Sequence, residues 1–185
     1  DEKAEATSTT FPLTVSSLTP GSETEEGQQI TFEDVTFDKM PERIVVFDYG
    51  FLDTLDALGV EGIVGIAANG GKGNIPANLK EKYVNAEGVA DVGGLKEVLF
   101  EELAATNPDA IFISGRQSAF YEELKEITPN VVFIGHDNEN YVEGLYETVD
   151  LAATIFGKEA EAEKLKADFQ AKVDAVKEKS AGYEN

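Results

Sequence analysis

Residues 43–59 read RIVVFDYGFLDTLDALG and decide the fold class, because they change from a strand pattern to a helix pattern without a break. Residues 44–47 are all apolar, which is typical of a parallel strand that is buried on both of its faces. Large apolar side chains then recur at helical spacing until a glycine ends the pattern, at Phe51, Leu52, Leu55, Leu58 and Gly59. A buried strand that leads directly into a helix is the repeating unit of α/β proteins.

The same strand-and-helix unit recurs along most of the chain. Further short apolar runs predict four more strands, at residues 63–67, 89–92, 110–114 and 131–135. Helical spacing of apolar residues predicts helices between them, near Leu79, over 98–104 and over 120–127. Short connections of this kind imply right-handed crossovers, so we predict an α/β fold with a mostly parallel sheet flanked by helices.

The two ends of the chain depart from this pattern. Residues 1–27 are rich in Ser, Thr and Glu and are interrupted by Pro and Gly, so we predict a disordered tether there. Apolar residues alternate over 28–37, which favours a hairpin or an edge strand. Residues 141–156 and 159–179 carry helical patterns with no strand signal between them, and the second has one apolar stripe and a charged opposite face. The predicted fold therefore ends in a long C-terminal helix.

The composition of the chain excludes several functions. Its 185 residues include 36 acidic and 15 basic ones, which gives a formal net charge of −21. Binding to nucleic acid depends on basic residues that displace counterions from phosphates, so we expect no nucleic-acid partner. The chain has no cysteine, which excludes disulfide scaffolds, thiolate metal sites and cysteine nucleophiles within it. No apolar run approaches the roughly 18 residues of a membrane span.

Candidate binding residues follow the predicted strands. In open parallel sheets, ligands bind at the carboxyl ends of strands, where loops lead into helices. Arg116 follows the strand at 110–114 and precedes a helix, where a guanidinium can meet an anion. Lys96 lies in a Gly-Gly-Leu-Lys turn at another predicted helix start, against the preference of the helix dipole. Tyr49 follows the first strand, and Gln117 follows Arg116 directly.

These residues also have ordinary structural interpretations. Arg116 would serve equally well in an ion pair with one of the many carboxylates, Lys96 as a solvated surface residue, and Tyr49 as a core residue. His136 is the one histidine, and a lone histidine beside an aspartate is more often a capped loop residue than a metal ligand, so we assign no metal site. The glycine-rich segment 70–74 lacks the Gly-Lys-Ser/Thr ending of a phosphate-binding loop. No nucleophile–base–acid set is visible, so we predict no catalytic residues.

Three segments, taken together, resemble a known family. They are residues 43–59, VGGLKE at 92–97 and NPDAIFISGRQ at 107–117. In this order and at this spacing they are similar to the signature segments of the iron–siderophore substrate-binding proteins of ABC importers, which are class III periplasmic-binding-protein-like. The Ser-Gly-Arg-Gln form at 114–117 resembles the catecholate branch, whose members bind ferric petrobactin or enterobactin-type ligands. The resemblance covers about residues 29–180.

The resemblance implies a protein of two α/β lobes joined by one long helix, with the ligand in a cleft between the lobes. On this basis residues 28–157 are the N-terminal lobe and residues 158–185 are the start of the inter-lobe spine helix, so the chain holds the N-terminal lobe only. The family's cleft arginine and lysine correspond to Arg116 and Lys96. The family's other arginines, and the side chains with which some members complete iron coordination, belong to the second lobe.

The resemblance also implies the function of the whole protein. It would be an extracytoplasmic substrate-binding component that captures an anionic ferric catecholate siderophore for iron uptake, held by Arg116, Lys96, Tyr49 and Gln117. The expected partners are the ferric siderophore and an ABC transporter permease. We expect a monomer that is not an enzyme, has no covalently bound cofactor and leaves the iron to the siderophore. Anchoring to the cell membrane through a lipid on a cysteine outside this chain is implied as well.

Other functions stay open on the sequence. The same kind of binding protein also takes haem, cobalamin or a hydroxamate siderophore as its ligand. A small nucleotide-dependent α/β enzyme would need a phosphate loop, and a purely structural surface domain would show no pair of basic residues beside a cleft. Titrations with different ligands would separate these alternatives.

Overall fold

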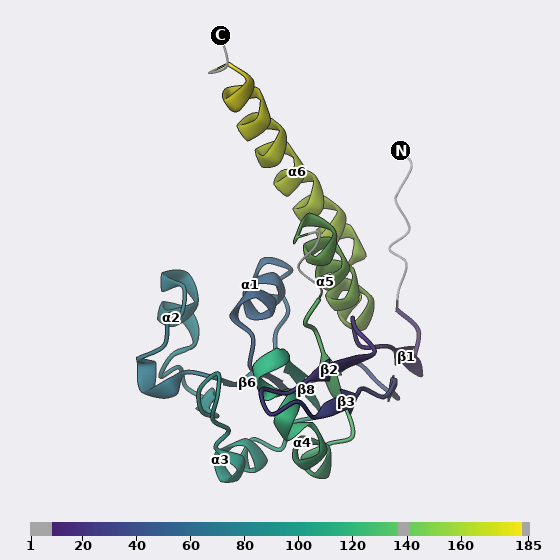
Figure 1. Ribbon diagram of the computed structural model, residues 1–185, viewed down its shortest axis with the longest axis vertical. Helices are drawn as coiled ribbons and strands as arrows, with labels where there is room; N and C mark the ends of the chain where they lie inside the picture. Colours follow the sequence, from purple (N-terminus) through teal and green to yellow (C-terminus); the bar gives the residue numbers. More distant parts are fainter. Residues whose placement is uncertain (1–8, 137–140, 183–185) are drawn as a thin grey trace.

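A computed structural model describes residues 9–136 and 141–182, and its centre is a five-stranded sheet. The strands are all parallel and follow the order β7-β6-β5-β8-β9 (Figure 1). Their bounds are β5 Ile44–Val46, β6 Ile63–Ile66, β7 Ala90–Asp91, β8 Ala110–Ile113 and β9 Val131–Phe133. Each strand lies within one of the predicted apolar runs, so the fold class predicted from the sequence is confirmed.

Both faces of this sheet are buried. Successive residues of a strand point to opposite faces, so the exposure of neighbouring residues reports on both. Ile44 and Val46 pack into the core on one face and Val45 and Phe47 on the other, and each is at most 1% exposed. Three helices cover the first face: α1 (Tyr49–Ala57), α2 (Ala77–Tyr83) and α5 (Tyr141–Phe156). Two helices cover the second face (Figure 1): α3 (Phe100–Ala105) and α4 (Tyr121–Ile127). Helices on both sides explain why the strands are continuously apolar.

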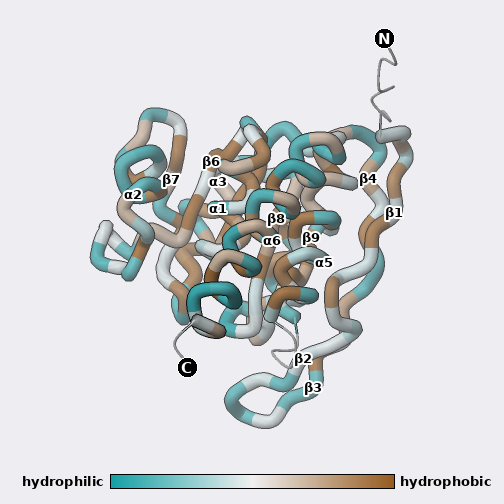
Figure 2. Tube along the Cα trace, turned by 90° about the horizontal axis from the view of Figure 1, so that it is seen from above, coloured by the Kyte–Doolittle hydropathy of each residue, from teal (hydrophilic) through white to brown (hydrophobic). Residues whose placement is uncertain are grey.

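The N-terminal part of the chain forms two further strand pairs, which are both antiparallel: β1 with β4 and β2 with β3. Their bounds are β1 Leu13–Val15, β2 Gly21–Glu23, β3 Gln29–Thr31 and β4 Val35–Phe37. The alternating stretch 28–37 therefore supplies two strands with different partners, in place of a single hairpin or edge strand. In Figure 2 the turn between β2 and β3 projects from the body of the molecule.

The described part of the predicted tether, residues 9–27, is thus built into the fold. The backbone N–H of Leu18 donates to the carbonyl of Phe133 at 3.0 Å, and the N–H of Phe133 donates to the hydroxyl of Ser17 at 3.0 Å. These bonds attach the segment to the end of β9, more than 110 residues away in sequence. The polar composition of the segment as a whole indicated disorder, although its short apolar patch at 11–15 supplies β1. Residues 1–8 of the predicted tether lie outside the described residues.

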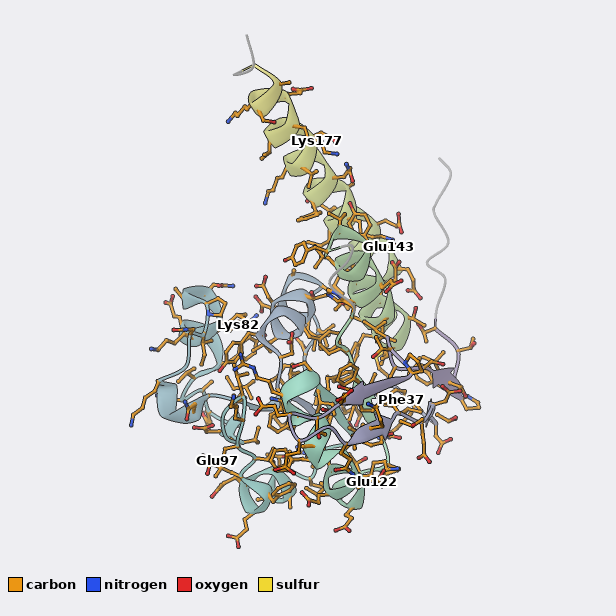
Figure 3. The ribbon with its side chains drawn as sticks, in the orientation of Figure 1. Phe37, Lys82, Glu97, Glu122, Glu143 and Lys177 are labelled. Carbon is orange, nitrogen blue, oxygen red and sulfur yellow. The ribbon has the colours of Figure 1, made fainter. Side chains whose placement is uncertain are left out.

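Helix α6 (Glu159–Ala181) extends well beyond the rest of the molecule (Figures 1 and 3). Its first half packs on α5, where the rings of Tyr146 and Phe169 lie 6.1 Å apart in an edge-on contact. Farther along, Val176 is 66% exposed, and Lys177 stands out from the helix in Figure 3. The predicted long C-terminal helix is therefore confirmed, while its role as a spine between two lobes stays a prediction. None of the described helices combines the length and the hydropathy that a membrane span requires.

Candidate functional site

The strand order reverses in the middle of the sheet. The chain passes from β5 outward through β6 to β7 and then returns to the other side of β5 for β8 and β9. In open parallel sheets, ligands bind beside the carboxyl ends of the strands at such a reversal. At those ends the backbone N–H of Phe47 donates to the carbonyl of Phe112 at 3.0 Å, so the segments after β5 and β8 begin side by side. Tyr49 and Arg116 come from these two segments, which makes this edge of the sheet the candidate site.

Arg116 lies in the first turn of the 3₁₀ helix η2 (Gly115–Phe120), directly after β8. It is exposed, and no other residue of 9–136 or 141–182 forms a hydrogen bond or ion pair with its guanidinium. Arg43, the other arginine of the chain, donates from its guanidinium to the backbone carbonyls of Thr106 and Asn107. The ion-pair interpretation of Arg116 therefore finds no support in the described residues, and its five N–H donors face solvent.

Lys96 is exposed in the turn between β7 and α3. The turn is tight: Gly93 has a φ of 119°, and the backbone N–H of Gly94 donates to the carbonyl of Glu97 at 2.9 Å. The ammonium of Lys96 pairs with the carboxylate of Glu25 at 3.1 Å, and the two side chains are 67% and 84% exposed. Ion pairs as exposed as this contribute about 0–1 kcal/mol, so a stronger anion can replace Glu25 at small cost.

Gln117 is only 1% exposed, and both ends of its amide are used inside the fold. Its Oε1 accepts from the backbone N–H of Ser114 at 3.1 Å, and its Nε2 donates to the carbonyl of Leu95 at 2.6 Å. The second bond ties η2 to the turn that carries Lys96. Arg116 and Lys96 are therefore on adjoining segments at the same edge. The buried amide connects these segments and has no exposed surface to offer a ligand in this arrangement.

Tyr49 begins α1 beside the same edge and is half-buried between the two hydrophobic clusters. Its hydroxyl donates to the carbonyl of Ala67 at 2.6 Å. Burial raises the pKa of the Tyr49 phenol, and the negative charge of Asp91 nearby raises it further. The hydroxyl is thus neutral and engaged within the fold, which leaves the ring as the part of Tyr49 that a ligand would contact. That role as an aromatic wall stays a prediction.

The glycine-rich segment after β6 does not form a phosphate-binding loop. The backbone N–H groups of Ala68, Asn69 and Gly70 all donate to the carboxylate of Asp91, and so does the N–H of Gly93. These four donors are therefore occupied by a carboxylate of the chain itself and are not free to bind a phosphate.

His136 follows β9, and its buried Nδ1 has no hydrogen-bond partner among the described residues. Its ring packs against Gly144 of α5, where an added Cβ would collide with it. With Asp48, Tyr141 and other residues it lines a cavity of about 260 Å³. Its sequence neighbours at 137–140 lie outside the described residues. Among the residues that are described, no three His, Cys, Asp or Glu side chains lie close enough together to hold a metal ion.

Sequence reasoning missed two residues at this edge, Glu25 and Asp91. Asp91 ends β7 directly before the Val-Gly-Gly-Leu-Lys-Glu segment, and an acidic residue at the end of a strand among glycines is a signal that could have found it. Glu25 carried no such signal, because it lies in a stretch that resembles a linker in composition. Its position depends on the pairing of β2 with β3.

Comparisons with known proteins agree with this architecture. The family model of periplasmic binding proteins matches residues 44–182. The chain is 37% identical over 110 residues to the petrobactin-binding protein YclQ of Bacillus subtilis, in a match that covers 55% of this chain and 32% of that protein.

Two solved structures of siderophore and iron uptake proteins have the same fold over most of the chain. The crystal structure of YclQ matches with a TM-score of 0.73 at 29% identity, over 89% of this chain and 54% of that one. The iron uptake ABC transporter substrate-binding protein PiuA of Streptococcus pneumoniae matches with a TM-score of 0.73 at 26% identity, over 92% and 56%. The chain thus spans about half the length of these solved relatives. Because the family model covers most of its residues, the chain belongs to the periplasmic binding protein family.

Proposed function

We propose that this chain is a ligand-binding lobe of the substrate-binding component of an ABC importer, and that the whole protein captures an anionic ferric catecholate siderophore for iron uptake. One observation carries the proposal: the guanidinium of Arg116, unpaired within the described residues, lies at the reversal of strand order on a segment that adjoins the Lys96 turn. Two relatives support this class of ligand, since one is a petrobactin-binding protein and the other is an iron uptake ABC transporter substrate-binding protein.

Local charge matters more than net charge for such a ligand. The chain carries a net charge of −21, but charges farther away than a Debye length of about 8 Å are largely screened at physiological salt. An anion ~4 Å from a cation gains about 4 kcal/mol of attraction at an effective dielectric constant of about 20, before desolvation costs. The two cations at the sheet edge therefore outweigh a distant acidic surface, provided that the carboxylate of Glu25 leaves Lys96 when the ligand arrives.

In this proposal, Arg116 and Lys96 donate charge-assisted hydrogen bonds to the oxygens of the catecholate groups. The ring of Tyr49 forms an aromatic wall beside them. The siderophore holds the iron, which is the cargo, and this lobe supplies binding and orientation without a covalent step. Gln117 completes the set predicted from the sequence, and its buried amide favours a supporting role over direct contact.

The proposal also covers the class of the protein, its location and its partner. The relatives are binding proteins, and we assign this protein to the same non-enzymatic class, with no covalently bound cofactor. It would work outside the cytoplasm as a monomer, held at the membrane by a lipid on a cysteine outside this chain. A transporter permease would receive the loaded protein.

One lobe supplies only part of the contacts. The 185-residue chain alone should therefore bind a ferric siderophore weakly, and a protein that also has the second lobe should bind it far more tightly. A high affinity of the isolated chain would show that the cleft between lobes is not needed.

Fluorescence-quenching titrations of the full-length protein with ferric petrobactin, ferric enterobactin and ferrichrome test the proposal. The two anionic catecholate complexes should bind, and the neutral hydroxamate ferrichrome should not. Lys96→Ala should weaken ferric petrobactin about tenfold, which corresponds to about 1.4 kcal/mol. Lys39→Ala is the matched control, since Lys39 is also exposed and pairs with Glu42 at 3.2 Å. Equal binding of ferrichrome, or equal effects of the two lysine variants, would contradict the proposal.

A further inference from the structure

We infer that Gln117 is a positioning residue, whose buried amide keeps the turn that carries Lys96 in place beside the segment that carries Arg116. This inference rests on the proposed function, because it explains how the two cations of the proposed site are held together. It differs from direct ligand binding in that Gln117 acts through the backbone of another segment.

The hydrogen bonds of Gln117 determine the orientation of its amide. The backbone N–H of Ser114 is a donor, so the atom opposite it at 3.1 Å must be Oε1. The carbonyl of Leu95 is an acceptor, so the atom 2.6 Å from it must be Nε2. The hydroxyl of Ser114 adds a third bond to Oε1 at 3.3 Å. A side chain that is 1% exposed and has partners at both ends is held in one conformation.

The two segments that Gln117 connects belong to different parts of the sheet. Ser114 follows β8, whereas Leu95 belongs to the turn after β7, at the far side of β6 and β5. Within the turn, the backbone N–H of Gly94 donates to Glu97 and that of Leu99 donates to Val92. Outside it, the carbonyl of Gly93 accepts from the N–H of Asn69 at 2.8 Å, and Lys96 pairs with Glu25. Within the described residues, the Gln117–Leu95 bond is the hydrogen bond that relates this turn to η2.

A fixed distance between the two segments favours the binding of a rigid ligand. The oxygens of a metal-bound chelate have set positions, so cations that are already spaced to match them lose less conformational freedom on binding. The side chain of Lys96 is 67% exposed, so the fold determines the position of its backbone more closely than that of its ammonium group. Gln117 places that backbone at the residue directly before Lys96.

The experiment measures the affinity of the full-length protein for ferric petrobactin by fluorescence quenching. Gln117→Met has a similar length and removes the bonds to Ser114 and to Leu95. Ser118→Ala is the matched control: Ser118 lies in the same helix, is also 1% exposed, and its hydroxyl donates to the carbonyl of Gly115 at 2.7 Å, within the helix itself. We expect Gln117→Met to weaken binding about fivefold, which lies within the range of effects found for residues that interact directly. Ser118→Ala should change the affinity by no more than about twofold. Thermal unfolding of both variants records their general effect on stability.

A double-mutant cycle separates positioning from a general structural effect. If Gln117 acts through Lys96, then Gln117→Met should cause no further loss when Lys96 is already alanine. The same fivefold loss in both backgrounds would overturn the inference and leave the proposed function intact. If Lys96→Ala and Arg116→Ala themselves have no effect on affinity, the proposed function fails instead. Should Gln117→Met not fold, Gln117→Glu replaces it in the cycle, because a carboxylate keeps the acceptor for Ser114 and repels the carbonyl of Leu95.

Discussion

The chain has two arginines, and they lie at opposite ends of the same sheet. Arg43 precedes β5, where its guanidinium donates to the carbonyls of Thr106 and Asn107 and its backbone N–H donates to Asp109. Arg116 follows β8, and none of the described residues accepts a hydrogen bond from its guanidinium. The arginine at the amino end of the strands therefore stabilises the fold through its hydrogen bonds, whereas the arginine at the carboxyl end has donors that a ligand can use. Unused donors, more than charge alone, distinguish the candidate site.

The largest effect should come from removal of the unused guanidinium. Arg116→Ala should weaken the binding of ferric enterobactin to the full-length protein by roughly tenfold to a hundredfold, because hydrogen bonds to charged groups contribute about 1.5–3 kcal/mol. Its free energy of unfolding should change by less than about 0.5 kcal/mol, as for other exposed side chains without partners. Titration and chemical denaturation measure the two quantities. Wild-type affinity in this variant would remove Arg116 from the site.

Arg43→Ala should give the opposite result. Loss of its bonds to the two carbonyls should lower the free energy of unfolding by about 1–2 kcal/mol, which chemical denaturation detects. Its affinity for ferric enterobactin should stay at the wild-type value, because Arg43 lies at the other end of the sheet. Weakened binding without loss of stability would show that the two ends are not functionally distinct.

A smaller effect concerns Tyr49, whose hydroxyl is bound to the carbonyl of Ala67. Its pKa is raised by burial and by Asp91, so the folded state favours the neutral phenol. The resulting stability is fully present below the unfolded pKa of about 10 and is lost as the pH rises through the higher folded value. Tyr49→Phe should therefore reduce stability at neutral pH by about 1 kcal/mol and make the alkaline loss less steep. An unchanged alkaline profile would show that this phenol does not titrate in that range.

The smallest effect should come from the carboxylate that now pairs with Lys96. Glu25→Gln removes a competitor of the anionic ligand, so binding should become tighter by about twofold, in line with an exposed ion pair of about 0–1 kcal/mol. The effect should decrease at high salt, because screening weakens the pair in the parent protein. Glu26→Gln changes the same net charge one residue away and serves as the control. Equal effects of both variants would indicate general electrostatics in place of a specific contact.

The parallel sheet could be predicted from the sequence because its strands are buried on both faces. Runs such as residues 44–47 and 110–113 have no polar position, and each is bounded by glycine, proline or a helical pattern. β1 and β2 could not be predicted in this way. They are three residues long, and the partner of Thr14 in the register is Thr36, 22 residues away. Their stability comes from contacts that local composition does not record.

The same distinction applies to the candidate site. The positions of Arg116 and Lys96 in segments that follow strands could be predicted, because parallel strands bring their carboxyl ends to one edge. Whether a side chain there is unpaired, paired or buried depends on neighbours from distant segments. The pairing of Lys96 with Glu25 and the burial of Gln117 therefore became visible only in the three-dimensional arrangement.

The most direct test follows the side-chain Nε–Hε signals of the 185-residue chain by NMR, since two arginines give two such signals. The titrant is a catecholate siderophore loaded with gallium(III), a diamagnetic substitute for ferric iron, and Arg43→Lys assigns the signals. We expect the Arg116 signal to shift progressively with added complex while the Arg43 signal stays in place. An Arg116 signal that does not move, or moves no more than that of Arg43, would contradict the claim that this guanidinium receives the ligand.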